Sequence, residues 1–173
     1  MTTNPSTAAK RKVPCMGDTL GPVGLRIEPV DDDQLETLLP MIAAYQGFYG
    51  RREIDAERNR SFFRRFIAPS DDGMLIAAWD GHDLVGYACL YWHFTSVSAA
   101  ETVLMNDLYV AETARGAGVG RALIEACAAV ARERGVGRLE WATRPDNDTA
   151  RRLYDATGAT ASTWVSYELD VSD

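Results

Sequence analysis

The fold is decided by the stretch Leu108-Tyr109-Val110-Ala111-Glu112-Thr113-Ala114-Arg115-Gly116-Ala117-Gly118-Val119-Gly120-Arg121. It passes from an apolar strand, through three glycines, into an alanine-rich helix. Glycines leave backbone N–H groups accessible because they carry no Cβ, and a helix N-terminus adds partial positive charge. Arg115 and Arg121 bracket the turn and can add charged hydrogen bonds. These residues predict a site for a phosphate-bearing ligand, although a glycine-rich turn without a ligand explains them equally well on their own.

Two other phosphate-binding motifs do not fit this turn. A dinucleotide fingerprint requires G-x-G-x-x-G after the first strand of a β-α-β unit, and Arg121 stands where its third glycine would be. The G-x-x-x-x-G-K-[ST] loop of many nucleotide triphosphatases is absent. The ligand is therefore of another phosphate-bearing class.

Working outward, the hydrophobic pattern predicts the elements on both sides of the turn. Strands are expected at 25–30, 74–79, 84–94, 102–110, 138–143 and 161–169, and helices at about 31–45, 55–67, 119–134 and 147–157. The three strands before the turn form an antiparallel meander, whereas a β-α-β crossover follows it. The fold class is therefore α/β (α+β) with a mixed sheet.

Two motifs at the right separation resemble the GNAT acetyltransferase superfamily. Arg115, Gly118 and Gly120 fill its R/Q-x-x-G-x-G/A motif, and Asn147 to Ala159 is similar to its N-x-x-A-x-x-L-Y-x-x-x-G-F/A signature. The run Asn106-Asp107-Leu108-Tyr109-Val110 looks closest to the subgroup of histone-, polyamine- and D-amino-acid-acetylating enzymes. The resemblance implies a mainly antiparallel sheet of six to seven strands flanked by about four helices, over residues 25–173.

The same resemblance implies acetyl-CoA as the donor and assigns residues to it. The cofactor would be held along the strand, at the turn and by the later helix, by residues Leu108, Tyr109, Val110, Arg115, Gly116, Ala117, Gly118, Val119, Gly120, Arg121, Asn147 and Tyr154. A β-bulge is expected in the strand, where a backbone N–H would serve as oxyanion donor. Tyr154 matches the family's general acid for the departing thiolate. Without the motif, Tyr154 would be interpreted as an aromatic residue that packs in the core.

The general base is left open by the sequence. Some relatives carry Glu at the position of Asn106, a second catalytic candidate, but an amide cannot take a proton. Asp107 is expected on the opposite face as a structural residue, which leaves Glu101, His93 or a water chain, with water preferred. For the acceptor, an aromatic and partly acidic mouth is predicted from Tyr45, Phe48, Tyr49 and Glu53, with simple packing of these aromatics as the alternative.

Composition limits the remaining partners. The length of 173 residues suits one domain. The net charge of −7 disfavours nucleic acid as a partner. No apolar run is long enough for a signal peptide or membrane span, so a cytoplasmic protein without a membrane partner is expected. Residues 1–24 read as a flexible tail, and the three scattered cysteines predict no metal site. The alternating final strand could pair across a homodimer.

Three functions follow from these observations. The first is acetyl transfer to a primary amine of a small molecule, by direct attack in a ternary complex. The second is acetylation of protein lysines or N-termini, and the third is a non-catalytic acyl-CoA-binding sensor. Tyr154 argues against the sensor, because a protein that only binds acyl-CoA has no use for a general acid.

Overall fold

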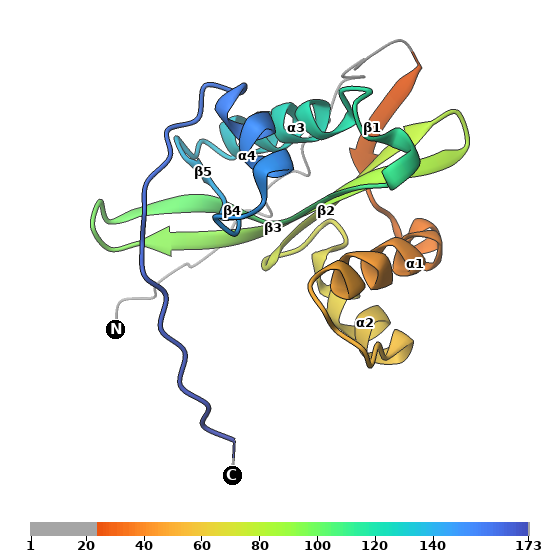
Figure 1. Cartoon of the computed structure of the whole chain (residues 1–173), viewed down its shortest axis with the longest axis horizontal. Helices are drawn as coiled ribbons and strands as arrows, with labels where there is room; N and C mark the ends of the chain where they lie inside the picture. The colour runs from red at the N-terminus through yellow and green to blue at the C-terminus, as the bar shows by residue number, and fades with distance from the viewer. Residues whose placement is uncertain (1–23, 173) are drawn as a thin grey trace, which may run out of the picture. The chain divides into compact units, whose positions relative to one another are not determined.

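The computed structural model describes residues 24–172, shown in Figure 1. Within these residues the chain divides into two compact units, 24–142 and 143–172. The predicted tail lies outside the described residues except for Gly24, as does Cys15. None of the helices in the described part of the chain combines the length and apolar character needed to cross a bilayer.

The first unit is built on a sheet of five strands in sequence order. They are β1 (Leu25–Pro29), β2 (Gly73–Asp80), β3 (Asp83–Thr95), β4 (Ala100–Val110) and β5 (Leu139–Glu140). Neighbours from β1 to β4 pair antiparallel, and β5 is parallel to β4. The predicted mixed, mainly antiparallel sheet is confirmed.

Three helices of this unit cover the two faces of the sheet (Figure 1). Helices α1 (Asp32–Phe48) and α2 (Ala56–Phe63) lie on one face, and α3 (Val119–Glu133) lies on the other. Short 3-10 turns follow α2 (η1, Arg64–Phe66) and precede α3 (η2, Glu112–Ala114). The predicted start of α1 is confirmed by a capping box between Asp31 and Gln34, which satisfies two free N–H groups.

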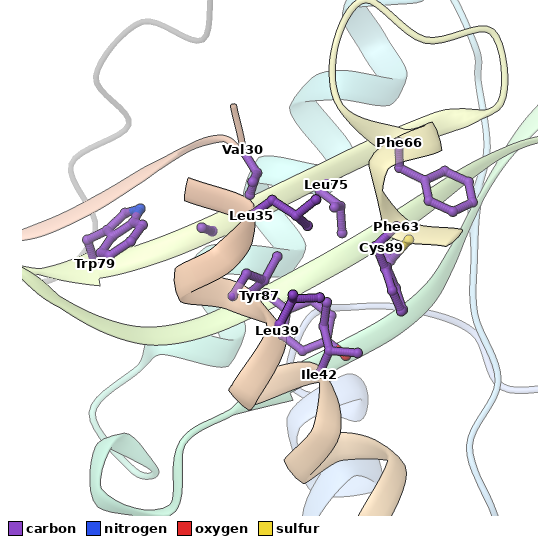
Figure 2. Close-up of a cluster of buried hydrophobic side chains, with 12 residues drawn as sticks. Val30, Leu35, Leu39, Ile42, Phe63, Phe66, Leu75, Trp79, Tyr87 and Cys89 are labelled. Atoms are coloured by element: carbon purple, nitrogen blue, oxygen red, sulfur yellow. The ribbon is translucent and has the colours of Figure 1, made fainter. Parts of the chain in front are cut away.

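The core between the sheet and the first two helices is apolar and aromatic. Alternate residues of β2 and β3 point toward α1, because side chains on a strand alternate between the two faces. Figure 2 shows Tyr87 and Cys89 of β3 there, with Leu39 and Ile42 of α1. This packing fixes the end of α1 over β3 and the neighbouring β4.

The second unit contains one helix, α4 (Asp148–Asp155), which Asn147 caps. The predicted strand Ala161–Leu169 is wrong: residues 161–172 form neither helix nor strand, and Trp164 and Tyr167 are 88% and 90% exposed. Alternation makes a strand only where a second strand supplies hydrogen-bond partners, and within the described residues none pairs with this segment. The described sheet therefore has five strands instead of six to seven.

Candidate active site

The glycine turn has the backbone geometry of an anion site. Gly116 and Gly118 have φ values of +80° and +85°, which residues with a Cβ rarely adopt. Gly118 is the N-cap of α3 and offers no side chain to the first N–H groups of the helix. Those N–H groups are consequently available to a bound anion at the positive end of the helix.

The two arginines of the turn are exposed and held by weak local contacts. The Arg115 Nε donates to the Val110 carbonyl at 3.3 Å, and its guanidinium lies 5.9 Å from the Tyr109 ring. Arg121 lies 3.7 Å from Glu125, one helical turn further on. Because surface contacts of this kind contribute little free energy, the Arg115 guanidinium can turn toward a phosphate at low cost.

Close packing beneath the turn depends on Gly86, which sequence reasoning did not single out. A Cβ on Gly86 would lie 2.9 Å from the Tyr109 carbonyl oxygen and 3.3 Å from the Val119 side chain. The missing side chain therefore lets α3 approach the sheet where β4 enters the turn. An isolated glycine in a strand pattern is the signal that points to such an approach.

Strand β4 has an open edge next to the turn. On one side, Leu108, Tyr109 and Val110 pair with Ala88, Tyr87 and Gly86 of β3. On the other side, β5 pairs only with Val103 and Leu104, so within residues 24–142 the same edge from 105 to 110 has no strand partner. An extended polar chain can hydrogen-bond there like an added strand.

The expected β-bulge is present in β4 and lies at Asn106. Cys89 pairs with Asp107 and the next residue, Leu90, pairs with Met105, which leaves Asn106 as the extra residue. A bulge disrupts the ladder and re-aims side chains. The geometry suits coenzyme A, because its pyrophosphate would lie at the turn and its amide-containing arm would pair with the open edge. When bound, acetyl-CoA would supply an activated acetyl thioester.

The predicted aromatic mouth is brought together at the end of α1. Tyr45 and Tyr49 have ring centroids 5.0 Å apart, Phe48 lies 5.2 Å from Tyr49, and Tyr45 also contacts Tyr87 and Tyr109 at 6.1 Å each. A hollow of about 320 Å³ adjoins Tyr109 between α1 and the end of β4. Glu53 is exposed in the loop after α1.

Asp107 lies in this aromatic cluster, although the sequence predicted only a structural role for it on the opposite face of the sheet. It is 3% exposed, and burial raises its carboxyl pKa to about 6, although hydrogen bonds from Tyr45 and Asn106 partly oppose the shift. The Asn106 Nδ2 donates to Asp107 Oδ1 at 2.9 Å and lies 3.2 Å from the Tyr91 hydroxyl. The two residues are thus hydrogen-bonded partners instead of occupants of unconnected faces.

The other predicted base candidates lie elsewhere along the strands. Glu101 is 3.8 Å from Arg134, close to the β3–β4 hairpin, and Arg134 stacks on Trp92 at 3.7 Å. His93 is exposed on β3 opposite Thr102. Both candidates are therefore several residues from the bulge, whereas Asp107 is adjacent to it.

In the second unit, the structure gives Asn147 a local role. Its Oδ1 accepts from the Ala150 N–H at 3.2 Å, and its Nδ2 donates to Thr143 Oγ1 at 3.1 Å. Tyr154 is partly buried in α4. The assignments of Asn147 to the cofactor and of Tyr154 to acid catalysis stay predictions.

Within residues 24–172, no three side chains of metal-ligating type are grouped as a metal site would require.

Comparison with known proteins agrees with these features. The model of the Acetyltransferase (GNAT) family matches residues 39–159. The D-amino-acid N-acetyltransferase HPA3 of Saccharomyces cerevisiae is 37% identical over 146 residues, covering 83% of each chain. A thialysine N-epsilon-acetyltransferase of Caenorhabditis elegans is 31% identical over 97 residues, covering 54% of this chain and 60% of the relative.

Solved structures agree as well. The crystal structure of a probable acetyltransferase is 29% identical, has a TM-score of 0.74, and aligns over 86% of this chain and 99% of its own. A ribosomal-protein-alanine N-acetyltransferase from Brucella melitensis biovar Abortus 2308 is 24% identical with a TM-score of 0.71, over 85% and 99% of the two chains, and shares the fold. With the family match across the turn and α4, these similarities establish that the chain belongs to the GNAT family and is an acetyltransferase.

Proposed function

We propose that this acetyltransferase moves the acetyl group of acetyl-CoA to a primary amine of a small molecule, by direct attack within a ternary complex. The observation that carries the proposal is the open edge of β4 between the glycine turn and the cluster of aromatic rings at the end of α1. An extended donor on that edge would meet an acceptor that enters from α1. Direct attack then needs no nucleophilic side chain, and the two described cysteines, Cys89 and Cys127, are buried.

A small acceptor is favoured by the relatives of the chain. Two relatives act, by their names, on D-amino acids and thialysine. Tyr154 would protonate the departing thiolate, as the sequence motif predicts.

A release assay for free thiol tests the proposal. Acetyl-CoA is offered with D-amino acids, thialysine, a polyamine and a lysine-containing peptide, and coenzyme A binding is measured separately by calorimetry. Turnover with one of the free amines, at higher kcat/KM than with the peptide, is the expected result. A faster peptide would support a protein acetyltransferase, and tight binding without any turnover would support a sensor.

A further inference from the structure

The environment of Asp107 differs from that of a carboxylate that only stabilises a fold. Buried acidic groups are usually paired with a cation, because an isolated charge is costly to bury. Burial raises the pKa of Asp107, and hydrogen bonds from Tyr45 and Asn106 lower it. In the described part of the chain, no cation acts on this pKa. The protein thus maintains a buried, unbalanced carboxylate next to the bulge of β4.

The titratable groups whose pKa values are raised by the charge of Asp107 are neutral near pH 7. They are Tyr45 from α1 and Tyr87, Cys89 and Tyr91 from β3, and the pKa of each is raised, chiefly by burial. Because these groups are uncharged, they cannot neutralise the carboxylate. A cation supplied from outside, such as an ammonium group, would be attracted to this position.

The hydrogen bonds around Asp107 have a defined direction. An ionised carboxylate only accepts, so the Tyr45 hydroxyl must donate to it. Tyr45 is also hydrogen-bonded to Tyr49, and this contact likewise raises the pKa of Tyr45. The result is a chain from Tyr49, which is 44% exposed, through Tyr45 to the buried Asp107.

A second polar group at this place lacks a partner. The Tyr87 hydroxyl is fully buried on the same face, and within residues 24–172 it has no hydrogen-bond partner. A buried hydroxyl without a partner is destabilising. The Tyr87 ring meets the Tyr45 ring edge to face, at a centroid distance of 6.1 Å, so a polar group that entered beside Tyr45 and Asp107 could satisfy the Tyr87 hydroxyl.

We propose that Asp107 takes the proton that the acceptor amine must lose, and that the proton reaches it through the hydroxyl of Tyr45. This inference rests on the proposed function. The ammonium N–H bond breaks and an O–H bond forms on Tyr45, while the former Tyr45 proton moves to a carboxylate oxygen of Asp107. The nitrogen keeps its electron pair and is free to attack the acetyl carbon.

The charges balance over the reaction. An ammonium and a carboxylate become an amine and a carboxylic acid, and Tyr45 is unchanged. Formation of an amide and a free thiol from an ammonium and a thioester releases one proton overall, and this is the proton that Asp107 holds. It returns to solvent through Tyr45 and the exposed Tyr49.

The pKa values suit these roles. With a pKa of about 6, Asp107 is mostly ionised above neutral pH and can receive a proton. Tyr45 does not ionise in this range because burial, followed by the charge of Asp107, raises its pKa. It therefore passes protons on and does not store them.

The test compares Asp107→Asn and Tyr45→Phe with wild type and with the surface controls Asp71→Asn and Tyr167→Phe. For each protein, kcat/KM for an amine is measured from pH 5 to 9.5, and coenzyme A affinity is measured by calorimetry. Wild type should lose activity below about pH 6 as Asp107 is protonated. Asp107→Asn should reduce kcat/KM by roughly 100-fold or more and abolish that limb, with unchanged coenzyme A affinity.

Tyr45→Phe should reduce kcat/KM by a similar factor. The fall of its kcat/KM at low pH should begin at a higher pH than in wild type, because Asp107 loses a hydrogen bond that favours its anion. In both variants, the loss should shrink for amines of lower pKa, since these are already partly neutral in solution. A residue that only supports the fold would not produce this dependence on amine pKa.

The outcomes separate the inference from the proposed function. Wild type that acetylates no amine contradicts the proposed function. If wild type is active and kcat/KM of both variants lies within about threefold of the wild-type value, with the same pH profile, the relay is overturned and the proposed function stands. If Asp107→Asn fails to fold, as judged by its unfolding transition and coenzyme A binding, the isosteric Tyr45→Phe decides by the same two measurements.

Discussion

Burying Asp107 beneath α1 lowers the stability of the fold whenever the carboxylate is ionised. Its pKa is about 6 in the folded chain, against 3.8 for an ordinary aspartate side chain. The folded state therefore binds more protons than the unfolded state between these two values, and stability falls as the pH rises through that window. A shift of about two units corresponds to about 3 kcal/mol.

This argument predicts that Asp107→Asn gains stability relative to wild type as the pH is raised from about 4 to 7, by up to about 3 kcal/mol. Urea unfolding at several pH values measures the difference, and Asp71→Asn should show no such trend. The variant would be less active and more stable at neutral pH. A difference that is constant with pH would show that Asp107 has an ordinary pKa.

Tyr154 permits a second prediction at this scale. Tyr154→Phe should lower kcat by about 100-fold, because a positioned general acid contributes at least that much, while coenzyme A affinity is preserved. Steady-state kinetics with calorimetry measures both, and Tyr167→Phe, at a 90% exposed tyrosine, is the matched control. An unchanged kcat would remove Tyr154 from the chemistry.

Single residues also show where sequence reasoning reaches its limit. The glycine turn could be predicted as local structure from residue type and spacing, whereas the assignment of the aromatic cluster to the acceptor stays a prediction. Asp107 was assigned a structural role on the face opposite Asn106, since regular alternation separates neighbours in a strand. The bulge at Asn106 breaks that alternation and lets the two side chains hydrogen-bond at 2.9 Å.

The helices and the meander were predictable as elements because their signals are local. Asp31 and Asp55 cap α1 and α2, and apolar periodicity defines α3. The final strand was not predictable, because alternation says nothing of whether a partner strand is available. The strand expected over 138–143 likewise shortens to Leu139–Glu140, since only two of its residues pair with β4.

Gly118 gives a prediction for the start of α3. Gly118→Ala should destabilise the protein by about 1–2 kcal/mol, because its φ of +85° crowds a Cβ. It should also weaken coenzyme A binding, since the turn presents the N–H groups. Thermal unfolding and calorimetry measure the two effects.

Gly118→Asn separates the two effects, because asparagine tolerates a left-handed conformation better than alanine. Its stability should lie closer to that of wild type, while coenzyme A binding stays weak because a side chain is present. Equal stability of the alanine variant and wild type would contradict the backbone argument.

The whole molecule carries a net charge of −7, which acts on substrates before they reach the site. With saturating acetyl-CoA, we expect kcat/KM for a cationic polyamine to fall by roughly threefold to tenfold between 0.05 and 0.5 M NaCl, since salt screens long-range attraction. A zwitterionic D-amino acid is the control and should change by less than about twofold. Equal responses would show that net charge does not steer the acceptor.

The open edge of β4 has a further consequence for the protein when no donor is bound. Unpaired N–H and C=O groups on a strand edge are a template for pairing with another chain, and within residues 24–142 those from 105 to 110 have no strand partner. A donor that occupied this edge would act as a protecting strand. Handling and storage should then succeed best with coenzyme A present, and self-association should rise when it is removed.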